Sequence, residues 1–235
     1  MQPSSGLHRT DAEHALAGLV SVSGLSVLSV ETFRRLIGPI ERYPAGAVLS
    51  SISPTPRLKW MLSGWVCEMR VLPDGRRQIF SFSIPGDVVL SRPVNASSPC
   101  SVVALTAVEC VDVVQTLARA KDSDRAELWR AMYLALTVAE ERRYEEIIRL
   151  GRRSAVQRLA DLLIELHDRL DRVGLVQNGN FSLPITQEHI ADVLGLSVVH
   201  VNRSLKTLRL KNLATFRFGR VSGFDRAGLV SYREL

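Results

Sequence analysis

LGLSVVHVNRSLKTLRLKN, residues 194–212, combines a short break with a helical pattern. Gly195 permits a tight turn that a residue with a Cβ atom would strain. Ser197 can cap a helix, because its hydroxyl accepts a hydrogen bond from a free backbone N–H. The next fourteen residues, 198–211, are predicted to form an amphipathic helix. At about 100° per residue, its inward stripe is Val201, Leu205 and Leu208.

The opposite face of this helix carries Val199, Asn202, Arg203 and Lys206, with His200 and Thr207 at its edge. These side chains suit the edges of DNA bases: Arg pairs with guanine, Asn with adenine, and Val contacts the thymine methyl group. An ordinary surface helix is the alternative, but it does not explain an outward Val beside Asn and Arg. We therefore predict base contacts by Val199, His200, Asn202 and Arg203, and a phosphate contact by Lys206.

The segments on either side complete a recognisable pattern. Thr186 can cap a preceding helix whose apolar positions include Ile190, Val193 and Leu194. A helix, a short turn and a second helix form a helix-turn-helix, whose second helix enters the major groove. Residues 214–224, ATFRFGRVSGF, alternate around Gly219-Arg220 and predict a hairpin wing. Arg217 and Arg220 would contact the phosphate backbone there.

The charge distribution agrees with a nucleic-acid partner. The chain has 235 residues and a net charge of +6. Residues 1–148 contain 16 basic and 16 acidic side chains, whereas residues 149–235 contain 14 and 8. A basic C-terminal third suits a polyanion, with nucleic acid favoured over a membrane surface. A solvated basic face without a partner is the alternative.

Cysteine usage and hydropathy indicate a cytoplasmic protein. Cys67, Cys100 and Cys110 show neither disulfide-scaffold nor metal-ligand spacing. Residues 15–30 are uncharged, but Asp11 and Glu13 precede them and the run is short for a membrane span. We expect this run to pack inside the protein.

The first half of the chain predicts a β-domain. Residues 29–37 suggest a short helix capped by Ser29, and residues 43–114 contain short apolar runs separated by turn residues. LPDGR, residues 72–76, predicts a hairpin turn, and Pro85-Gly86-Asp87 a second turn. Such a pattern is typical of a β-sandwich or roll.

Residues 122–150 contain no Gly or Pro and predict a long helix. We expect its stripe to form a two-helix dimer seam; packing across its own β-domain is the alternative. The stripe consists of Leu128, Met132, Leu136, Ala139 and Arg143. Gly151 marks the expected break, residues 152–172 a second helix, and residues 173–184 a polar loop that ends at Pro184.

This order of parts resembles the Crp/Fnr superfamily of bacterial transcription regulators, chiefly in ITQEHIADVLGLSVVHVNRSLKTLRLKNL and less in LPDGRRQIFSFSIPGD. The resemblance implies an α+β fold with a jelly-roll (double-stranded β-helix, cyclic-nucleotide-binding-like) sensor domain over residues 1–120. A dimerisation helix over 121–150 and a winged helix-turn-helix domain over 151–235 would follow. It places Val199, Asn202 and Arg203 at base-reading positions, where relatives often carry an acidic residue instead of Val199. It places Thr186, Gln187, Ser197 and Lys206 at backbone-contact positions.

The sensor half departs from the cyclic-nucleotide binders of the family. They carry Gly-Glu-Leu and then Arg-Ser/Thr-Ala, where this chain has Leu90-Ser91-Arg92 and SSPC at residues 97–100. Without the Glu and Arg, a cyclic phosphate lacks its charge-assisted contact, unless Arg92 substitutes. Three cysteines cannot hold a four-cysteine iron–sulfur cluster. Haem on Cys67 or a histidine is an alternative to a plain core cysteine, and we predict no cofactor.

We therefore predict a homodimeric regulator that binds an inverted-repeat DNA site and interacts with RNA polymerase, with no membrane association. An enzyme is disfavoured, because all five histidines lie outside residues 43–114 and cannot form a metal site within the roll. A regulator that uses its winged helix to bind proteins is the third possibility.

Overall fold

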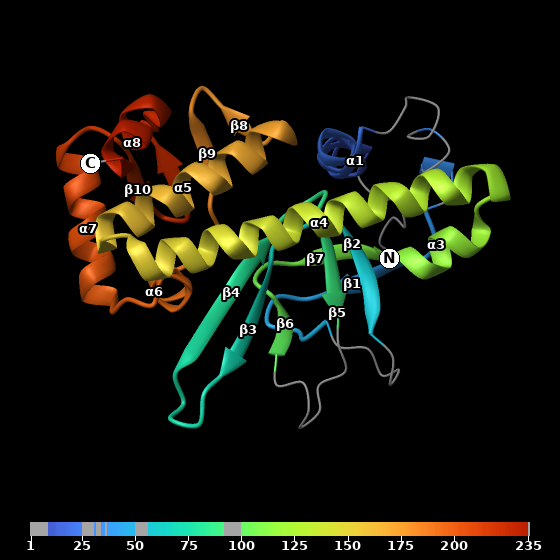
Figure 1. The fold of residues 1–235 in the computed structure, drawn as a ribbon, viewed down its shortest axis with the longest axis horizontal. Coiled ribbons are helices and arrows are strands. Elements are labelled where there is room, and N and C mark those ends of the chain that lie inside the picture. The colour runs from blue at the N-terminus through green and yellow to red at the C-terminus, as the bar shows by residue number, and fades with distance from the viewer. Residues whose placement is uncertain are drawn as a thin grey trace, which may run out of the picture.

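The computed structural model describes residues 9–24, 31, 34–35, 37–49, 56–91 and 100–234. A β-roll occupies one half of the molecule, the C-terminal domain the other, and one long helix runs along both (Figure 1). None of the described helices is long and apolar enough to cross a bilayer. The predicted limits of the three domains, 1–120, 121–150 and 151–235, stay a prediction.

The roll consists of two antiparallel sheets with strand orders β1-β7-β2-β5 and β4-β3-β6. Its strands are β1 (Ile40–Tyr43), β2 (Arg57–Ser63), β3 (Val66–Val71), β4 (Arg77–Ser83), β5 (Val88–Ser91), β6 (Cys100–Ala104) and β7 (Val108–Asp112). Alternate residues point inward and form a small core that includes Met61, Val66, Val102 and Cys110. The predicted hairpin turn is confirmed, since the Gly75 N–H donates to the Leu72 carbonyl at 2.9 Å between β3 and β4.

The N-terminal uncharged run packs inside the protein as far as the structure describes it. Helix α1 (Arg9–Ser23) lies against α4 and β2, and Ala15, Leu16 and Leu19 are buried. The predicted helix at residues 29–37 falls largely outside the described residues; of its positions, Glu31, Arg34 and Arg35 are helical. Ser29 lies outside the described residues.

The long helix is α4 (Asp122–Arg152), which follows the short helix α3 (Val113–Arg119). The prediction of a break at Gly151 was wrong, because α4 continues through it. An exposed Gly inside a helix costs only about 1 kcal/mol, so it does not force an end. The break lies at Arg153, where the side chains of Ser154 and Gln157 form a capping box that starts α5 (Ala155–Arg172).

The C-terminal domain surrounds α5 with α6 (Gln187–Leu194), α7 (Val198–Leu210), α8 (Arg226–Arg233) and one small sheet. The sheet has the order β10-β11-β9-β8, with β8 (Val176–Gln177), β9 (Asn180–Ser182), β10 (Thr215–Arg217) and β11 (Arg220–Ser222). The predicted polar loop at 173–184 was wrong, because it contains the β8–β9 hairpin. Asn178-Gly179, with φ values of 50° and 70°, forms the tight turn, and Phe181 is buried.

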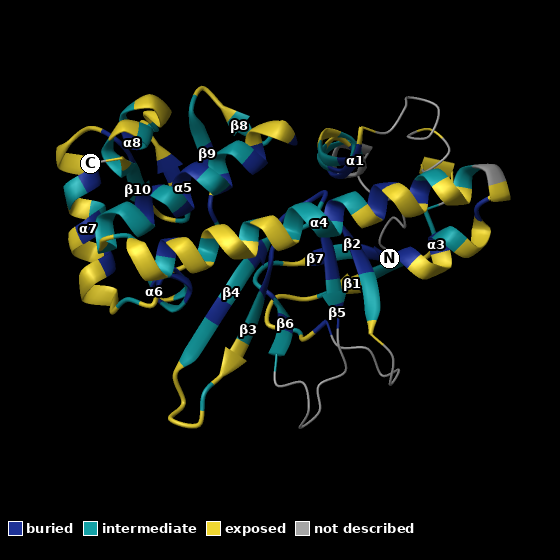
Figure 2. Cartoon of the chain, in the orientation of Figure 1, coloured by how far each residue is buried: buried dark blue, intermediate teal, exposed yellow. Residues whose placement is uncertain are grey.

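The roll and the C-terminal domain share one apolar core. Trp65, Cys67, Ile79 and Phe82 of the roll belong to the same buried cluster as residues of α5, α6 and α7. Helix α6 lies against β4, and an ion pair of 2.9 Å joins Arg77 to Asp192 across this contact. Figure 2 shows buried segments in α5, the central helix of the C-terminal domain. The C-terminal domain is therefore held against the roll.

Candidate nucleic-acid interface

The helix-turn-helix is formed by α6 and α7. The Thr186 hydroxyl accepts from the His189 N–H at 3.2 Å, and the Ser197 hydroxyl accepts from the His200 N–H at 3.3 Å. Between the helices, Gly195 has φ 60° and ψ 39°, the left-handed conformation that a Cβ atom disfavours. The two caps and the Gly turn predicted from the sequence are confirmed.

His189 completes the cap of α6, a role that sequence analysis missed. Its Nδ1 accepts from the Thr186 backbone N–H at 3.2 Å. Burial, together with the nearby Arg77, lowers the pKa of His189 and so favours the neutral ring that this hydrogen bond requires. The position of His189, three residues after Thr186, matches the capping-box spacing, although Glu or Gln is the usual partner there.

Helix α7 divides its residues as predicted. Val201 and Leu208 are fully buried and Leu205 is half-buried, whereas Val199, Asn202, Arg203 and Lys206 are exposed. Val199 has 59% of its surface exposed, and no packing contact accounts for its outward position. The structure thus presents the four predicted side chains together on one solvent-facing surface. Their contacts with DNA stay a prediction.

This surface has no negative charge of its own. Helix α7 contains no Asp or Glu. Within the described part of the chain, no ion pair involves Arg203 or Lys206. The Asn202 amide donates to the Val198 carbonyl at 3.1 Å, and the His200 ring Nδ1 lies 3.2 Å from the Ser197 hydroxyl. To contact a base, the Asn202 amide would have to give up its hydrogen bond to the Val198 carbonyl. The His200 ring already lies beside the Ser197 hydroxyl that caps α7.

The wing is present, with a corrected turn. Its two central residues are Phe218 and Gly219, at φ 49° and 68°, rather than Gly219-Arg220. The reason is the pairing register, in which Arg217 lies opposite Arg220. Both arginines are exposed, as their predicted phosphate contacts require. The Leu183 N–H donates to the Gly219 carbonyl at 2.8 Å, which places the wing tip beside the segment leading into Thr186. Thr186 is exposed and Gln187 is half-buried.

The stripe of α4 that was predicted to face a second copy of the chain instead faces the interior of this chain over part of its length. Leu128 and Met132 are fully buried within the chain, against α1 and the roll, as in the alternative considered above. Leu136 and Ala139 are half-buried, and Arg143 pairs with Glu68 at 2.6 Å. A neighbouring stripe, about 100° around the helix, is exposed instead. It contains Trp129, Tyr133, Tyr144 and Ile147, which are 54–66% exposed.

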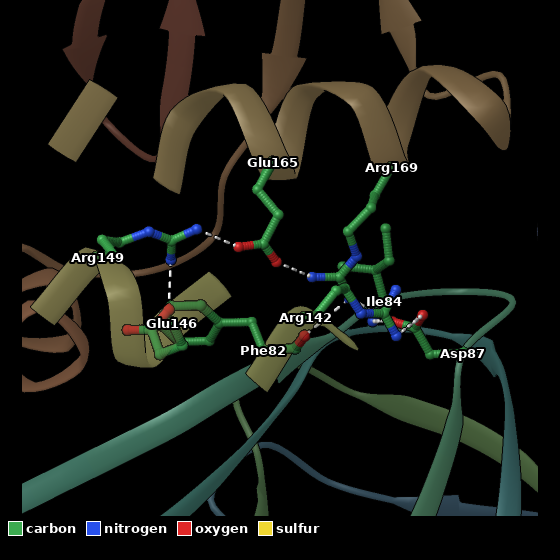
Figure 3. Close-up of polar contacts among 8 residues, drawn as sticks. All are labelled: Phe82, Ile84, Asp87, Arg142, Glu146, Arg149, Glu165 and Arg169. Carbon is green, nitrogen blue, oxygen red and sulfur yellow. Dashed lines mark hydrogen bonds and ion pairs between the residues drawn. The ribbon is translucent and has the colours of Figure 1, made fainter. Parts of the chain in front are cut away.

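A network of buried charges joins the roll, α4 and α5 (Figure 3). Arg169 pairs with Asp87 and with Glu165, and it donates to the Phe82 carbonyl at 2.8 Å. Arg142 also pairs with Asp87, at 3.2 Å. Arg149 pairs with Glu165 at 2.6 Å and with Glu146. Asp87 belongs to the predicted Pro-Gly-Asp turn, so this turn connects the roll directly to the C-terminal domain.

Sequence analysis did not identify this network. Its helical members lie on the inward faces of α4 and α5. A charged residue within an otherwise apolar stripe is the feature of the sequence that could have indicated a buried ion pair. Burial alone would raise the pKa of Glu165, but the charges of Arg149 and Arg169 outweigh it and lower that pKa. For Glu146, burial outweighs the attraction of the Arg149 charge and raises the pKa of the carboxyl group to about 7.

A cavity of about 460 Å³ lies between β4, β5 and α4. Its walls include Phe80, Leu90 and Leu136, and three arginines that already pair with Asp87 or Glu68: Arg142, Arg143 and Arg169. Arg92, the residue considered as a substitute contact for a cyclic phosphate, lies outside the described residues.

The three cysteines do not gather at one site. Cys67 and Cys110 are buried in different sheets, and burial raises the pKa of their thiols to about 11 and about 12. Cys100 is half-buried. Among the described residues, no group of three or more His, Cys, Asp or Glu side chains could hold a metal ion.

Comparison with known proteins agrees with this arrangement. A family profile described as the Crp-like helix-turn-helix domain matches residues 157–232. The nitrogen fixation regulation protein FixK of Rhizobium meliloti is 31% identical over 160 residues, which cover 67% of this chain and 69% of FixK. The chain belongs to the Crp/Fnr superfamily. This Crp/Fnr protein is a transcription regulator with a DNA-binding helix-turn-helix domain.

Further relatives extend the match over more than four fifths of the chain. The transcriptional activatory protein AadR of Rhodopseudomonas palustris is 29% identical over 216 residues, which cover 87% of this chain and 85% of AadR. The solved structure of FixK2 from Bradyrhizobium japonicum aligns with a TM-score of 0.63 at 24% identity, covering 82% of this chain and 96% of FixK2. The family and fold class predicted from the sequence are confirmed.

Proposed function

We propose that this Crp/Fnr regulator binds an inverted-repeat DNA site as a homodimer. The observation that carries the proposal is the exposed, carboxylate-free face of α7, where Arg203 and Asn202 are placed to contact base edges and Val199 a thymine methyl group. Lys206, Thr186, Gln187 and Ser197 would contact phosphates beside it, and Arg217 and Arg220 would do so from the wing. His200, engaged at the cap, lies at the edge of the base-contact surface.

The homodimer would form along the exposed stripe of α4. Trp129, Tyr133, Tyr144 and Ile147 recur at intervals of three or four residues or their sums, as side chains of a two-helix seam do. Two symmetry-related copies of α7 would then enter successive major grooves about 34 Å apart. The inverted repeat follows from this two-fold symmetry.

Selection of binding sites from random duplex DNA by the purified protein tests the proposal. We expect an enriched palindrome, and Arg203→Ala should lose preference at one position in each half-site, at about 1–3 kcal/mol per contact. Arg70→Ala, which removes one exposed arginine of β3, is the matched control and should keep both affinity and preference. The proposed DNA binding would be refuted if no palindrome were enriched, or if Arg203→Ala kept the base preference of the wild type.

The salt dependence of binding separates DNA binding from a winged helix that binds proteins. Each phosphate contact releases counterions, so the logarithm of affinity should fall steeply with the logarithm of salt concentration. A flat dependence would favour the protein-binding alternative. We further propose that the regulator acts in the cytoplasm without enzymatic activity and contacts RNA polymerase. Transcription by purified RNA polymerase from a promoter carrying the selected site, compared with and without the regulator, would test that contact.

The cavity favours an additional role as a ligand-responsive sensor. Its arginines already pair with carboxylates, so they offer no unpaired cation to a cyclic phosphate. We therefore propose an effector other than a cyclic nucleotide. Calorimetry should detect no binding of cyclic AMP, and DNA affinity should be the same with and without it.

A further inference from the structure

The tip of the wing carries an aromatic ring that no described part of the chain covers. Phe218 is 103% exposed, more than any other large apolar residue in the described ranges. Burial of a Phe side chain is worth about 1.5–3 kcal/mol, so leaving it in water forgoes that gain. A smaller polar residue would serve the turn equally well.

The backbone makes the choice of Phe more unusual. Phe218 has φ 49°, in the left-handed region that bulky residues avoid. The β8–β9 turn of the same sheet has nearly the same geometry, with Asn178-Gly179 at 50° and 70°. Asn and Gly are the residues that this turn type prefers. Phe218 therefore occupies a position where both burial and backbone conformation favour Asn.

The two turns lie at opposite ends of the sheet. The carbonyl of Gly219 accepts from the Leu183 N–H, in the segment that leads into α6. The β8–β9 turn instead lies on the side away from α6 (Figure 1). The wing tip and the N-terminus of α6 thus belong to the same end of the domain, where the phosphate contacts of α6 are proposed.

The charges around Phe218 indicate what the ring would meet. Arg217 and Arg220 lie opposite each other in the hairpin, and both are exposed. No ion pair among the described residues involves either of them. A ring between two free cations fits the minor groove, whose walls carry phosphates and whose interior presents sugars and base edges. A protein partner would not need cations on both sides of the ring.

We propose that Phe218 is a DNA-contact residue whose ring enters the minor groove flanking each half-site, while Arg217 and Arg220 bind the phosphates of its walls. The inference rests on the proposed function, because it places α7 in the adjacent major groove. Flanks rich in A·T pairs are expected to bind best, since the amino group of guanine obstructs the groove floor.

The test uses two duplexes that contain the inverted repeat selected by the wild-type protein. The long duplex adds A·T-rich flanks on both sides of the repeat, and the other duplex has no flanks. Phe218→Asn copies the β8–β9 turn, and Phe218→Gly removes the ring without adding an amide. Both should bind the long duplex roughly tenfold more weakly than the wild type. Their salt dependence should be unchanged, because a neutral ring releases no counterions. On the duplex without flanks they should match the wild type, and Phe218→Tyr should bind both duplexes normally.

Asn178→Phe, the reverse change in the other turn, is the control and should leave affinity unaltered. Replacement of flanking adenine by 2,6-diaminopurine, which adds an amino group to the minor groove, should weaken the wild type but not Phe218→Asn. Wild-type affinity for the long duplex in both Phe218→Asn and Phe218→Gly would overturn the inference, even if transcription fell. Absence of any palindrome bound by the wild type would instead overturn the proposed function.

Discussion

Val199 is the position at which we propose that a single side chain sets the preference for one base. Its side chain is more than half exposed beside Asn202 and Arg203, so packing does not explain an apolar residue there. Apolar contact with a thymine methyl group gives the side chain a partner and uses no hydrogen bond. The base specified at this position should therefore change with the chemistry of residue 199.

Val199→Glu should shift the preferred base opposite residue 199 towards cytosine, whose amino group donates to a carboxylate. The discrimination expected is about 1–3 kcal/mol, and the other positions of the half-site should keep their preferences. Selection of binding sites with the variant measures this. An unchanged consensus would mean that Val199 does not face a base.

At the scale of one element, α4 carries apolar side chains on two faces with different surroundings. One face is buried against α1 and the roll through Leu128 and Met132. The other presents Trp129, Tyr133, Tyr144 and Ile147 to water, and Figure 2 colours several segments of α4 as exposed. A helix of 31 residues spans about 46 Å, long enough to bury a continuous seam against a second copy.

Ile147→Glu, which places a charge on this exposed stripe, should convert the proposed homodimer to a monomer. A buried unpaired carboxylate is strongly unfavourable in an apolar seam. Sedimentation measures the mass, and DNA affinity should fall because one half-site alone remains bound. Glu145→Lys changes charge on an exposed position about 160° away and should remain dimeric. A dimeric Ile147→Glu protein would place the interface elsewhere.

At the scale of the whole molecule, buried charges join the roll to the DNA-binding domain. The network from Asp87 to Glu146 crosses from the roll through α5 to α4. Charges taken out of water are stable only when each has its partner, so the network penalises arrangements that separate the two halves.

Arg169→Met leaves Asp87 and Glu165 without their shared guanidinium. Removal of one partner from a buried ion pair typically costs about 3–5 kcal/mol, and a similar loss of unfolding free energy is expected. Denaturant unfolding measures it. Arg172→Met, one turn further along α5 and exposed, is the control and should change stability by less than about 0.5 kcal/mol. Equal stabilities of the two variants would contradict a structural role for the network.

Glu146 should give the protein a pH dependence near neutrality. Its pKa of about 7 in the folded protein exceeds its ordinary value of 4.5, so folding favours the protonated form. The contribution of Glu146 to the free energy of unfolding should be greatest below pH 4.5. It should be lost as the pH rises through 7, by on the order of 1–3 kcal/mol.

Glu146→Gln, neutral at every pH, should lose this decline between pH 5 and 8. Thermal unfolding across that range compares the two proteins. Asp87 and Glu165 act in the opposite direction, because their lowered pKa values give stability that is lost only in acid. A decline of equal size in Glu146→Gln would show that Glu146 is ionised in the folded protein at neutral pH.

Local chemistry in the sequence was sufficient for the helix-turn-helix, since Thr186, Gly195 and Ser197 act on their own backbone and the stripe of α7 follows from helical geometry. The hairpin at LPDGR and the order of roll, long helix and winged domain were also predictable, because turn residues and hydrophobic periodicity are local signals. The β8–β9 hairpin was missed although Asn178-Gly179 signals it. Only the tertiary structure decided which face of α4 is covered, because α1 and the roll, which are distant from it in the sequence, pack together on that face. The same is true of the partners of Arg169 and of the position of the wing tip beside α6, since both depend on contacts between residues far apart in the chain.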